Sequence, residues 1–567
     1  MTSACRLGPP ILLSLGTVLG AGCYTGTRAD SHGDGESTAA SADSGDASSS
    51  GADGGDTDPG ACASVAAGLA PMRRLTAVQY RNTILDLFGG TIEPSAAFPV
   101  TQTYKEYSNN PSLNVVSLPT AMDLLQAAEE VATAVIDDVD AVVSCDGTDD
   151  QACAEAFVDD FGGRAFRRPL RDDERAALLA LYGEAAASDG FADGIGTVVA
   201  AVLQSPQFLY LVEEGTGELA PGIVSLSDHE IAARLSYLLW DTMPDATLRE
   251  AADAGELQDP EGIQAQVERM LADDARATPA LQRFVREWNH YDGVPTYDKD
   301  TAVYPQFTDA LSASIDEELS RFVAGVLRSD EPTLAQLLTS TQTEVDAEVA
   351  ALLGADAPAP GTWAPVSLGP ERGGILTRPA ILAEHSHRAD TGPIFRGELV
   401  RTQLLCEAIP PPPPDAMANA PEYPEGATER ERSEILMNHM NCGTCHALMN
   451  PIGLGFEDYD AIGTLRTVDI DGSAIDNSGE VVGGPEAVTG SFHGLAELQA
   501  ELAASDEVTA CFAHQLMQYS FGITDDQVDD CAIAPVAEAF VAADGDIREL
   551  VIALARSEAF RTRKLEP

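Results

Sequence analysis

Five consecutive residues near the C-terminal end of the chain have the spacing C-x-x-C-H, namely Cys442-Gly443-Thr444-Cys445-His446. Two thiols at this spacing lie about one helical turn apart and can bond to the two vinyl groups of one porphyrin. The histidine that follows is then held under the iron, where it can supply the proximal nitrogen. The motif therefore predicts covalent haem c, attached at Cys442 and Cys445 and ligated by His446.

Three other interpretations of these residues remain open. A zinc site could use Cys442, Cys445 and His446, but it needs a fourth ligand, and the chain has no second C-x-x-C. A redox-active dithiol is usually accompanied by a βαβ pattern, which is absent here. A disulfide between Cys442 and Cys445 would be strained because only two residues separate them.

The iron of an electron-transfer haem needs a second ligand on the other face of the porphyrin. Met449 lies only three residues after His446 on the same helix and cannot cross the ring. The later segment 511–521 is helical and apolar, so we predict Met517 as the distal ligand, with core packing of Met517 as the alternative. The other candidates are His514, His493 and His385.

The residues after the motif predict how its helix ends. Pro451, Gly453 and Gly455 are expected to stop the helix and form a loop along the porphyrin. Arg466 could pair with a haem propionate. The aspartates around Gly472 resemble part of a calcium loop, but the full EF-hand pattern is missing and a solvated turn is favoured.

The charge of the chain excludes one class of partner. It contains 33 Lys and Arg residues and 91 Asp and Glu residues, which gives a formal net charge of −58. Such a chain is repelled by nucleic acid, so no nucleic-acid partner is expected. A cationic redox protein would be attracted to this surface, although the charge alone does not identify that partner.

The N-terminus has the pattern of an export signal. Arg6 precedes the apolar stretch 11–19, and Gly20-Ala21-Gly22 precedes Cys23. Small residues before a cysteine resemble a bacterial lipoprotein signal, in which the cysteine after the cut is lipidated. We therefore expect an exported protein, anchored to a membrane through Cys23, in the periplasm or at the outer membrane and cell surface. No other apolar run in the sequence has the length of a membrane span.

Six further cysteines remain for the mature chain, and an oxidising compartment would allow three disulfides among them. They are Cys62, Cys145, Cys153, Cys406, Cys511 and Cys531. Local spacing favours the pairs Cys145–Cys153 and Cys511–Cys531, which leaves Cys62–Cys406. Free buried thiols are the alternative.

The apolar periodicity predicts a mainly α fold, with several small helical domains in series and a cytochrome-c-like helical haem segment near the C-terminus. In chain order we expect a lipoprotein-type signal peptide at 1–23, a disordered acidic Gly/Ser-rich tether at 24–60, helical domains at 61–140, 141–215 and 222–353, the domain with the haem motif at 363–480, and a C-terminal helical domain at 490–567. Arg73 and Arg74 are expected as surface charges at a helix start. The arginines of 164–168 are expected to pair with internal carboxylates.

Several strings of the sequence together resemble one known family. They are Arg73-Arg74-Leu75-Thr76 with Tyr80-Arg81-Asn82-Thr83, Arg164-Ala165-Phe166-Arg167-Arg168-Pro169-Leu170, Ser205-Pro206-Gln207-Phe208-Leu209, Arg234-Leu235-Ser236-Tyr237 with Trp240, and Cys442 to His446 with Asn450-Pro451-Ile452-Gly453. They are similar to exported multi-domain proteins of planctomycetes and myxobacteria, which combine the domains of unknown function 1587, 1595, 1592, 1588 and 1585 with a cytochrome-c-like segment. The resemblance implies haem linked to Cys442 and Cys445, with His446 as axial ligand. It implies no substrate.

These observations leave three functions. The first is a c-type cytochrome that exchanges electrons with an unidentified redox partner protein at the cell envelope. The second is a peroxidase-like haem enzyme with an open distal face, and the third is a surface binding or scaffold protein with a structural haem. The first is the function we expect.

Overall fold

The structure is a computed structural model that describes residues 70–94, 106–144, 150–291, 299–410 and 420–565. Most of these residues are helical, and the sheets are small, so the predicted mainly α fold is confirmed. The expected signal peptide, the tether and Cys23 lie outside the described residues. Within the described ranges, no helix is both long enough and apolar enough to cross a membrane.

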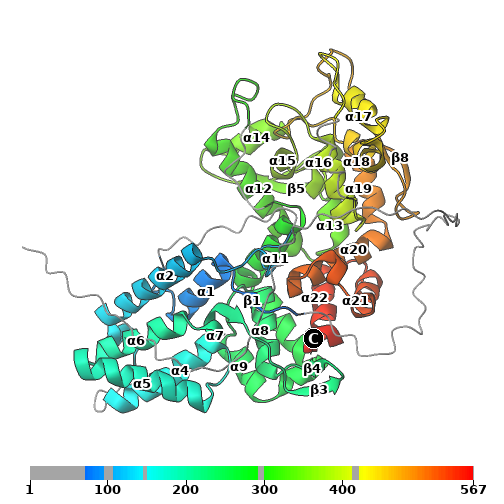
Figure 1. Ribbon diagram of the computed structural model, residues 1–567. Helices are drawn as coiled ribbons and strands as arrows, with labels where there is room; N and C mark the ends of the chain where they lie inside the picture. Colours follow the sequence, from blue (N-terminus) through cyan, green and yellow to red (C-terminus); the bar gives the residue numbers. More distant parts are fainter. Residues whose placement is uncertain (1–69, 95–105, 145–149, 292–298, 411–419, 566–567) are drawn as a thin grey trace, which may run out of the picture. The chain divides into compact units, whose positions relative to one another are not determined.

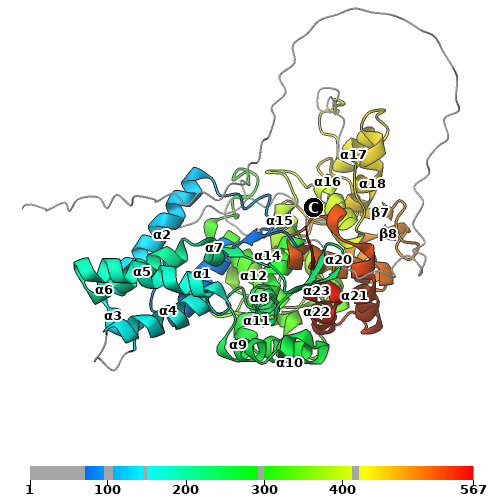
Figure 2. The ribbon, with the colours of Figure 1, turned by 60° about the horizontal axis from the view of Figure 1, so that its bottom comes forward.

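The first group of helices packs around its own core. Its elements are β1 (Arg73–Arg74), α1 (Ala77–Leu87), α2 (Leu118–Asp137), α3 (Val139–Val142), α4 (Asp150–Phe166), α5 (Asp172–Asp189), α6 (Phe191–Leu203), α7 (Pro206–Leu209) and β2 (Tyr210–Leu211). Helix α6 lies beside both α2 and α5 (Figures 1 and 2). The start of α1 is a capping box, in which Thr76 accepts from the Gln79 amide and the Gln79 side chain accepts from the Thr76 amide.

A second group follows. It comprises β3 (Gly217–Ala220), β4 (Ile223–Ser225), α8 (Asp228–Leu239), α9 (Ala246–Asp253), the short 3₁₀ helix η1 (Glu256–Gln258), α10 (Pro260–Leu271), α11 (Asp274–Trp288), α12 (Asp309–Leu327), α13 (Leu334–Thr339), β5 (Gln342–Val345), α14 (Ala347–Leu353) and β6 (Ala364–Ser367). Ser227 and Glu230 form the capping box of α8, as their spacing indicates. Strands β5 and β6 pair antiparallel.

The third group carries the C-x-x-C-H motif. It comprises η2 (Pro370–Arg372), η3 (Ile375–Thr377), α15 (Pro379–Glu384), α16 (Pro393–Leu399), the π-helix η4 (Val400–Leu404), α17 (Glu429–Met437), α18 (Gly443–Leu454) and β7 (Ser478–Val481). Helix α18 packs against α16, α17 and β7. In both views α17 and α18 are the yellow helices and lie beside the yellow-green α16 (Figures 1 and 2).

The last group is helical and returns to the second group. It comprises β8 (Gly490–His493), α19 (Gly494–Ala503), α20 (Asp506–Phe521), η6 (Asp525–Gln527), α21 (Asp530–Ala542), α22 (Ile547–Arg556), α23 (Glu558–Arg561) and β9 (Thr562–Lys564). Strand β8 pairs with β7, and β9 pairs with β4. The end of the chain therefore joins both preceding groups.

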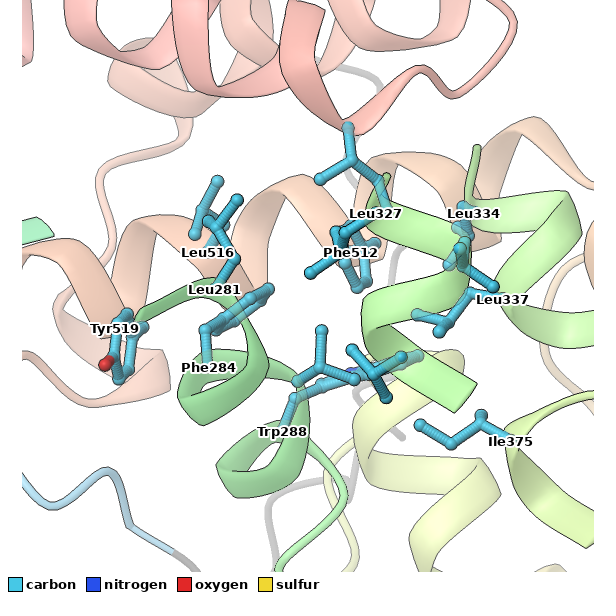
Figure 3. Packing of buried hydrophobic residues seen from close by; sticks show 14 of the residues in the cluster. Leu281, Phe284, Trp288, Leu327, Leu334, Leu337, Ile375, Phe512, Leu516 and Tyr519 are labelled. Atoms are coloured by element: carbon cyan, nitrogen blue, oxygen red, sulfur yellow. The ribbon is translucent and has the colours of Figure 1, made fainter. Parts of the chain in front are cut away.

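Two hydrophobic clusters form the core of the described chain. One lies within the first group, with Tyr237 and Met243 added from α8 and the turn after it. The other contains Tyr107 and residues from Leu226 to Phe560. At its centre, Phe284 and Trp288 of α11 face Phe512 of α20, with ring centroids 5.4 and 4.8 Å apart (Figure 3). The last three groups thus share one core rather than having one each.

One arginine of the 164–168 segment joins the first group to the second. The Arg167 guanidinium donates to the Tyr237 hydroxyl at 2.8 Å and to the carbonyls of Gln207, Phe208 and Tyr210. Arg168 pairs with Glu174 and Arg164 with Asp160, so the expected carboxylate pairing holds for these two but not for Arg167. Arg167 instead satisfies backbone carbonyls at the end of α7.

Two local expectations are wrong. Arg73 and Arg74 are not surface charges at a helix start. They form β1, paired with Tyr210 and Leu211, and the Arg74 side chain bonds to Asn114. Pro451 does not end the helix that follows the haem motif, because α18 continues to Leu454. The helix loses one backbone donor at Pro451 but is held on several sides by packing.

Candidate functional site

The C-x-x-C-H motif lies at the beginning of α18. Cys442 is the N-cap residue, and Cys445 and His446 are in the first turn. Both cysteines are free thiols and half-buried, so the strained Cys442–Cys445 disulfide is not formed. Two free thiols on one turn, followed by a histidine, are the arrangement that thioether attachment of haem needs.

The imidazole of His446 is oriented by its own helix. Its Nδ1 lies 3.0 Å from Oδ1 of Asn450, one turn further along α18, and Asn450 is fully buried. An Nδ1–H that donates to Asn450 fixes the tautomer with the lone pair on Nε2, the atom that would bind iron. Asn450 was not predicted as a site residue. The signal was its i, i+4 spacing from His446.

The two thiols have different neighbours. The Cys442 sulfur lies 3.1 Å from Nδ1 of His439, in the turn between α17 and α18. The Cys445 thiol donates to the Pro410 carbonyl at 3.6 Å. Pro410 begins a run of five prolines, and the rest of that run lies outside the described residues. The chain before the run therefore meets the motif directly.

Close backbone contact fixes α18 against α16. A methyl group added to Gly397 would overlap the Met449 carbonyl, and one added to Gly453 would overlap the Pro393 carbonyl. Glycine at both positions lets the two helices approach until their backbones touch. The buried Arg396 of α16 then donates to the carbonyls of Phe456, Tyr459 and Asp460, so the chain that leaves α18 is fixed as well.

A cavity of 480 Å³ lies between α17 and the segment that leads into α16. Its apolar lining comes from Pro393, Ile394, Tyr423 and Leu436. Its charged lining consists of two arginines and two acidic residues, namely Arg388, Arg432, Asp390 and Glu429. Burial raises the pKa of Glu429 to about 7, although the neighbouring Arg432 opposes this shift. Apolar walls with nearby cations suit a flat apolar group that carries carboxylates, so these residues fit haem.

The described residues contain no group of three or more His, Cys, Asp or Glu side chains that could hold a metal ion. A haem does not need such a group, because the porphyrin supplies four of the iron ligands and the protein only the axial ones. The turn at 469–473 closes through backbone hydrogen bonds. Its Asp471 carboxylate accepts from the Ser473 amide, as in an ordinary Asx turn.

The predicted distal ligand, Met517, lies in the hydrophobic core. Met517 is 2% exposed in the hydrophobic core, and it does not line the cavity. Of the other candidates, His514 lies 2.9 Å from Asp525, and Nε2 of His385 lies 2.9 Å from the Asn289 carbonyl oxygen. His493 ends β8.

Arg466 is committed to protein groups. It donates to the Glu457 carbonyl at 2.8 Å and also pairs with the carboxylates of Glu457 and Asp469. Burial raises the pKa of Glu457, and the guanidinium of Arg466 works against that shift. The Arg466–Glu457 pair therefore stabilises the turn after α18, where a propionate would have to displace an existing partner.

One disulfide corrects two predicted pairs. Cys406 is bonded to Cys511, so neither Cys511–Cys531 nor Cys62–Cys406 can form. The pairing is long-range because the π-helix η4 ends directly beside α20, and spacing along the chain could not indicate this. Cys153 and Cys531 are also disulfide-bonded. The expected partner of Cys153, Cys145, lies outside the described residues, as does Cys62.

Comparison with protein families finds five matches in succession along the chain. In chain order their descriptions are Protein of unknown function (DUF1587) at residues 73–137, (DUF1595) at 153–213, (DUF1592) at 226–354, (DUF1588) at 372–469 and (DUF1585) at 490–560. The haem motif, α16 and the cavity all lie in the DUF1588 segment or at its edge. No curated protein and no solved structure matches the chain. These five domains are those expected from the sequence, and the chain belongs to the multi-domain family that combines DUF1587, DUF1595, DUF1592, DUF1588 and DUF1585.

Proposed function

We propose that this protein is an exported c-type haem protein that transfers electrons at the cell envelope. One observation carries the proposal. Two free thiols lie on the first turn of α18, and the histidine beside them has its Nδ1 engaged by a buried asparagine. Haem c, when bound, supplies the one-electron chemistry. The chain would hold it through Cys442, Cys445 and His446.

Covalent attachment is tested in the full chain, expressed together with a cytochrome c maturation system. The protein should keep a haem stain in a denaturing gel and gain the mass of one haem. Changing Cys442→Ala and Cys445→Ala together should remove both signals. The matched control is Cys406→Ser with Cys511→Ser, which also removes two cysteines but should retain the stain. An unstained wild-type protein, or a stained Cys442/Cys445 double variant, would refute the proposal.

The proposed location rests on the N-terminal sequence. Residues 1–23 act as the export signal, and Cys23 carries the lipid that anchors the protein in the periplasm or at the outer membrane and cell surface. Cys23→Ser should move the protein from the membrane fraction to the soluble fraction. An unchanged distribution between the two fractions would exclude the lipid anchor.

The redox partner is expected to be cationic. A formal charge of −58 attracts a positively charged protein over long distances and increases its association rate at low ionic strength. Electron transfer between the reduced protein and a basic cytochrome should therefore slow as salt is raised. A rate that does not change with ionic strength would exclude this kind of partner.

A further inference from the structure

Two residues in the lining of the cavity relate it to the helix that carries the haem motif. Tyr423, in its lining, lies close enough to Cys442 for that thiol to add to the rise in the pKa of its phenol, for which burial is the larger cause. Pro393, also in the lining, abuts Gly453 of α18. His446, Asn450 and Gly453 are spaced i, i+4, i+7 and share one face of α18. The cavity therefore lies beside α18, the helix that carries His446.

Aromatic side chains around this cavity are unusually accessible. Tyr423 is 42% exposed and Phe395 is 39% exposed, although large apolar side chains elsewhere in the described chain are mostly buried. Phe395 is the third residue of α16, and its ring lies 5.1 Å from the imidazole of His387. A flat apolar group placed here would cover these rings.

His387 lines the same cavity and carries an uncommitted imidazole. Within the described residues, no hydrogen bond or ion pair engages its ring nitrogens. This distinguishes it from His385, which bonds to Asn289, and from His514, which pairs with Asp525. An exposed imidazole with no hydrogen-bond partner among the described residues, in the lining of a cavity in the same segment as a haem motif, is available to an iron atom.

The backbone of His387 is held in place. Its amide donates to the Asp390 carbonyl at 3.1 Å, and its own carbonyl accepts from the buried Lys299 ammonium at 3.0 Å. Lys299 also donates to the Ala383 carbonyl and to the Ser386 hydroxyl, at 2.8 and 2.7 Å. These hydrogen bonds hold the backbone of the turn that contains His387 in one position, as a segment that carries a ligand requires.

We propose that the haem attached at Cys442 and Cys445 occupies this cavity, with His387 as its second axial ligand. The inference rests on the proposed function and deepens it. The iron then has two imidazole ligands, His446 and His387, and is six-coordinate and low-spin. The lining holds two arginines, Arg388 and Arg432, which can bind carboxylates, although Arg432 also pairs with Glu429 at 2.7 Å. Two imidazoles also give a lower reduction potential than one imidazole and one thioether.

The test uses the matured full-length protein and its absorption and electron paramagnetic resonance spectra. The wild-type protein should be low-spin, should lack the near-infrared band of sulfur ligation, and should not change when cyanide is added. His387→Ala should keep the covalent haem stain but lose the low-spin signal and bind cyanide. Imidazole added to the buffer should restore the low-spin spectrum, which shows that the variant is folded. His387→Met should gain the near-infrared band and a higher potential.

The matched control is His493→Ala, which removes an imidazole outside the cavity and should leave the spectrum unchanged. A low-spin spectrum that survives His387→Ala overturns the ligand assignment. A spectrum lost in Met517→Ala but kept in His387→Ala assigns the ligand to Met517 instead. Both outcomes leave the haem stain in place, whereas absence of the stain from the wild-type protein would mean that the proposed function itself has failed.

Discussion

At the scale of single residues, the haem motif depends on a neighbour one turn away. The hydrogen bond from His446 to Asn450 keeps the imidazole in one orientation and increases the basicity of the nitrogen that would bind iron. The Nδ2 amide of Asn450 is buried and has no hydrogen-bond partner among the described groups. That cost is tolerated at a position that orients the imidazole of His446.

Substitution of Asn450 should change the reduction potential more than the fold. Asn450→Leu removes the acceptor for Nδ1–H, so the imidazole becomes a weaker donor to ferric iron and the potential should rise. Asn450→Asp supplies a stronger acceptor and should lower it. Potentiometric titration of the matured protein measures both shifts. Thr444→Ala, an exposed change within the motif, is the control, and equal potentials in all four proteins would contradict the role of Asn450.

A second residue-scale prediction concerns pH. Glu174 lies in the first turn of α5, where its carboxylate accepts hydrogen bonds from the Arg168 guanidinium at 2.7 and 2.8 Å and from the Arg171 amide. The Arg168 guanidinium is the main cause that lowers the pKa of Glu174 to about 2. Because the folded pKa lies below the unfolded one, this stabilisation is present above pH 4.5 and is lost as the pH falls towards 2.

Glu174→Gln should therefore lower the free energy of unfolding by roughly 1–2 kcal/mol at pH 7. The difference from the wild-type protein should shrink between pH 5 and the acid transition, as urea titrations at several pH values would show. Asp173→Asn, an exposed change in the same turn, is the control. A difference that stays constant with pH would mean that Glu174 does not act through its charge.

At the scale of elements, the contact between α16 and α18 determines where the haem motif lies. Gly397 meets the Met449 carbonyl and Gly453 meets the Pro393 carbonyl, so neither helix has a flexible side chain that could yield at the crossing. The two helices are consequently positioned by backbone contact, which is less tolerant of change than contact between side chains.

Gly397→Ala should separate α16 from α18. The added methyl group overlaps a backbone carbonyl, so the free energy of unfolding should fall by roughly 1–3 kcal/mol, the usual cost of overpacking. Gly183→Ala, in α5, meets no atom within 4 Å and should instead stabilise the protein by roughly 0.5–1 kcal/mol. Urea denaturation compares the two variants, and a neutral Gly397→Ala would mean that the crossing can relax.

At the scale of the whole molecule, the Cys406–Cys511 disulfide ties the DUF1588 segment to the DUF1585 segment across a sequence separation of 105 residues. Trp288 supports the same junction, because its indole donates to the Gln403 carbonyl at 2.8 Å while its ring packs on Phe512. At the end of the chain, Arg234 bonds to the Phe560 carbonyl and β9 pairs with β4. The DUF1592, DUF1588 and DUF1585 segments are therefore mutually dependent.

Removal of the disulfide should destabilise the protein without removing the haem. A closed loop of this length contributes on the order of 4–5 kcal/mol in the chain-entropy description. Cys406→Ser with Cys511→Ser should lower the unfolding transition in urea by an amount of that order, while the haem stain persists. Transitions that coincide before and after the change would show that packing at the junction is sufficient by itself.

The shared core gives a prediction about fragments. Core residues of the DUF1588 segment, such as Leu399 and Phe456, belong to the same cluster as Phe322 and Phe512 of neighbouring segments. A fragment of residues 372–469 alone would expose these side chains and should show no cooperative thermal transition, whereas the full chain should show one. A folded fragment would mean that the segment has a sufficient core of its own.

The sequence by itself determined the features that depend on residues three or four positions apart. The capping boxes at Thr76 and Ser227, the helical class and the C-x-x-C-H motif follow from spacing, because the hydrogen bonds and the thiol positions involved lie within one helical turn. The His446–Asn450 pair belongs to this set as well, since both residues lie on one helix.

Only the tertiary structure decided the features that join distant segments. Three such features depend on which surfaces pack together. They are the disulfide between Cys406 and Cys511, the hydrogen bonds from Arg167 to the carbonyls at the end of α7, and the continuation of α18 through Pro451. The contrast between His385 and His387 has the same origin. The two residues are two positions apart, yet one is buried against Asn289 and the other lines a cavity, because the chain turns between them. Chain spacing carries no information about these pairings, since each is determined by burial and by the partners that packing makes available.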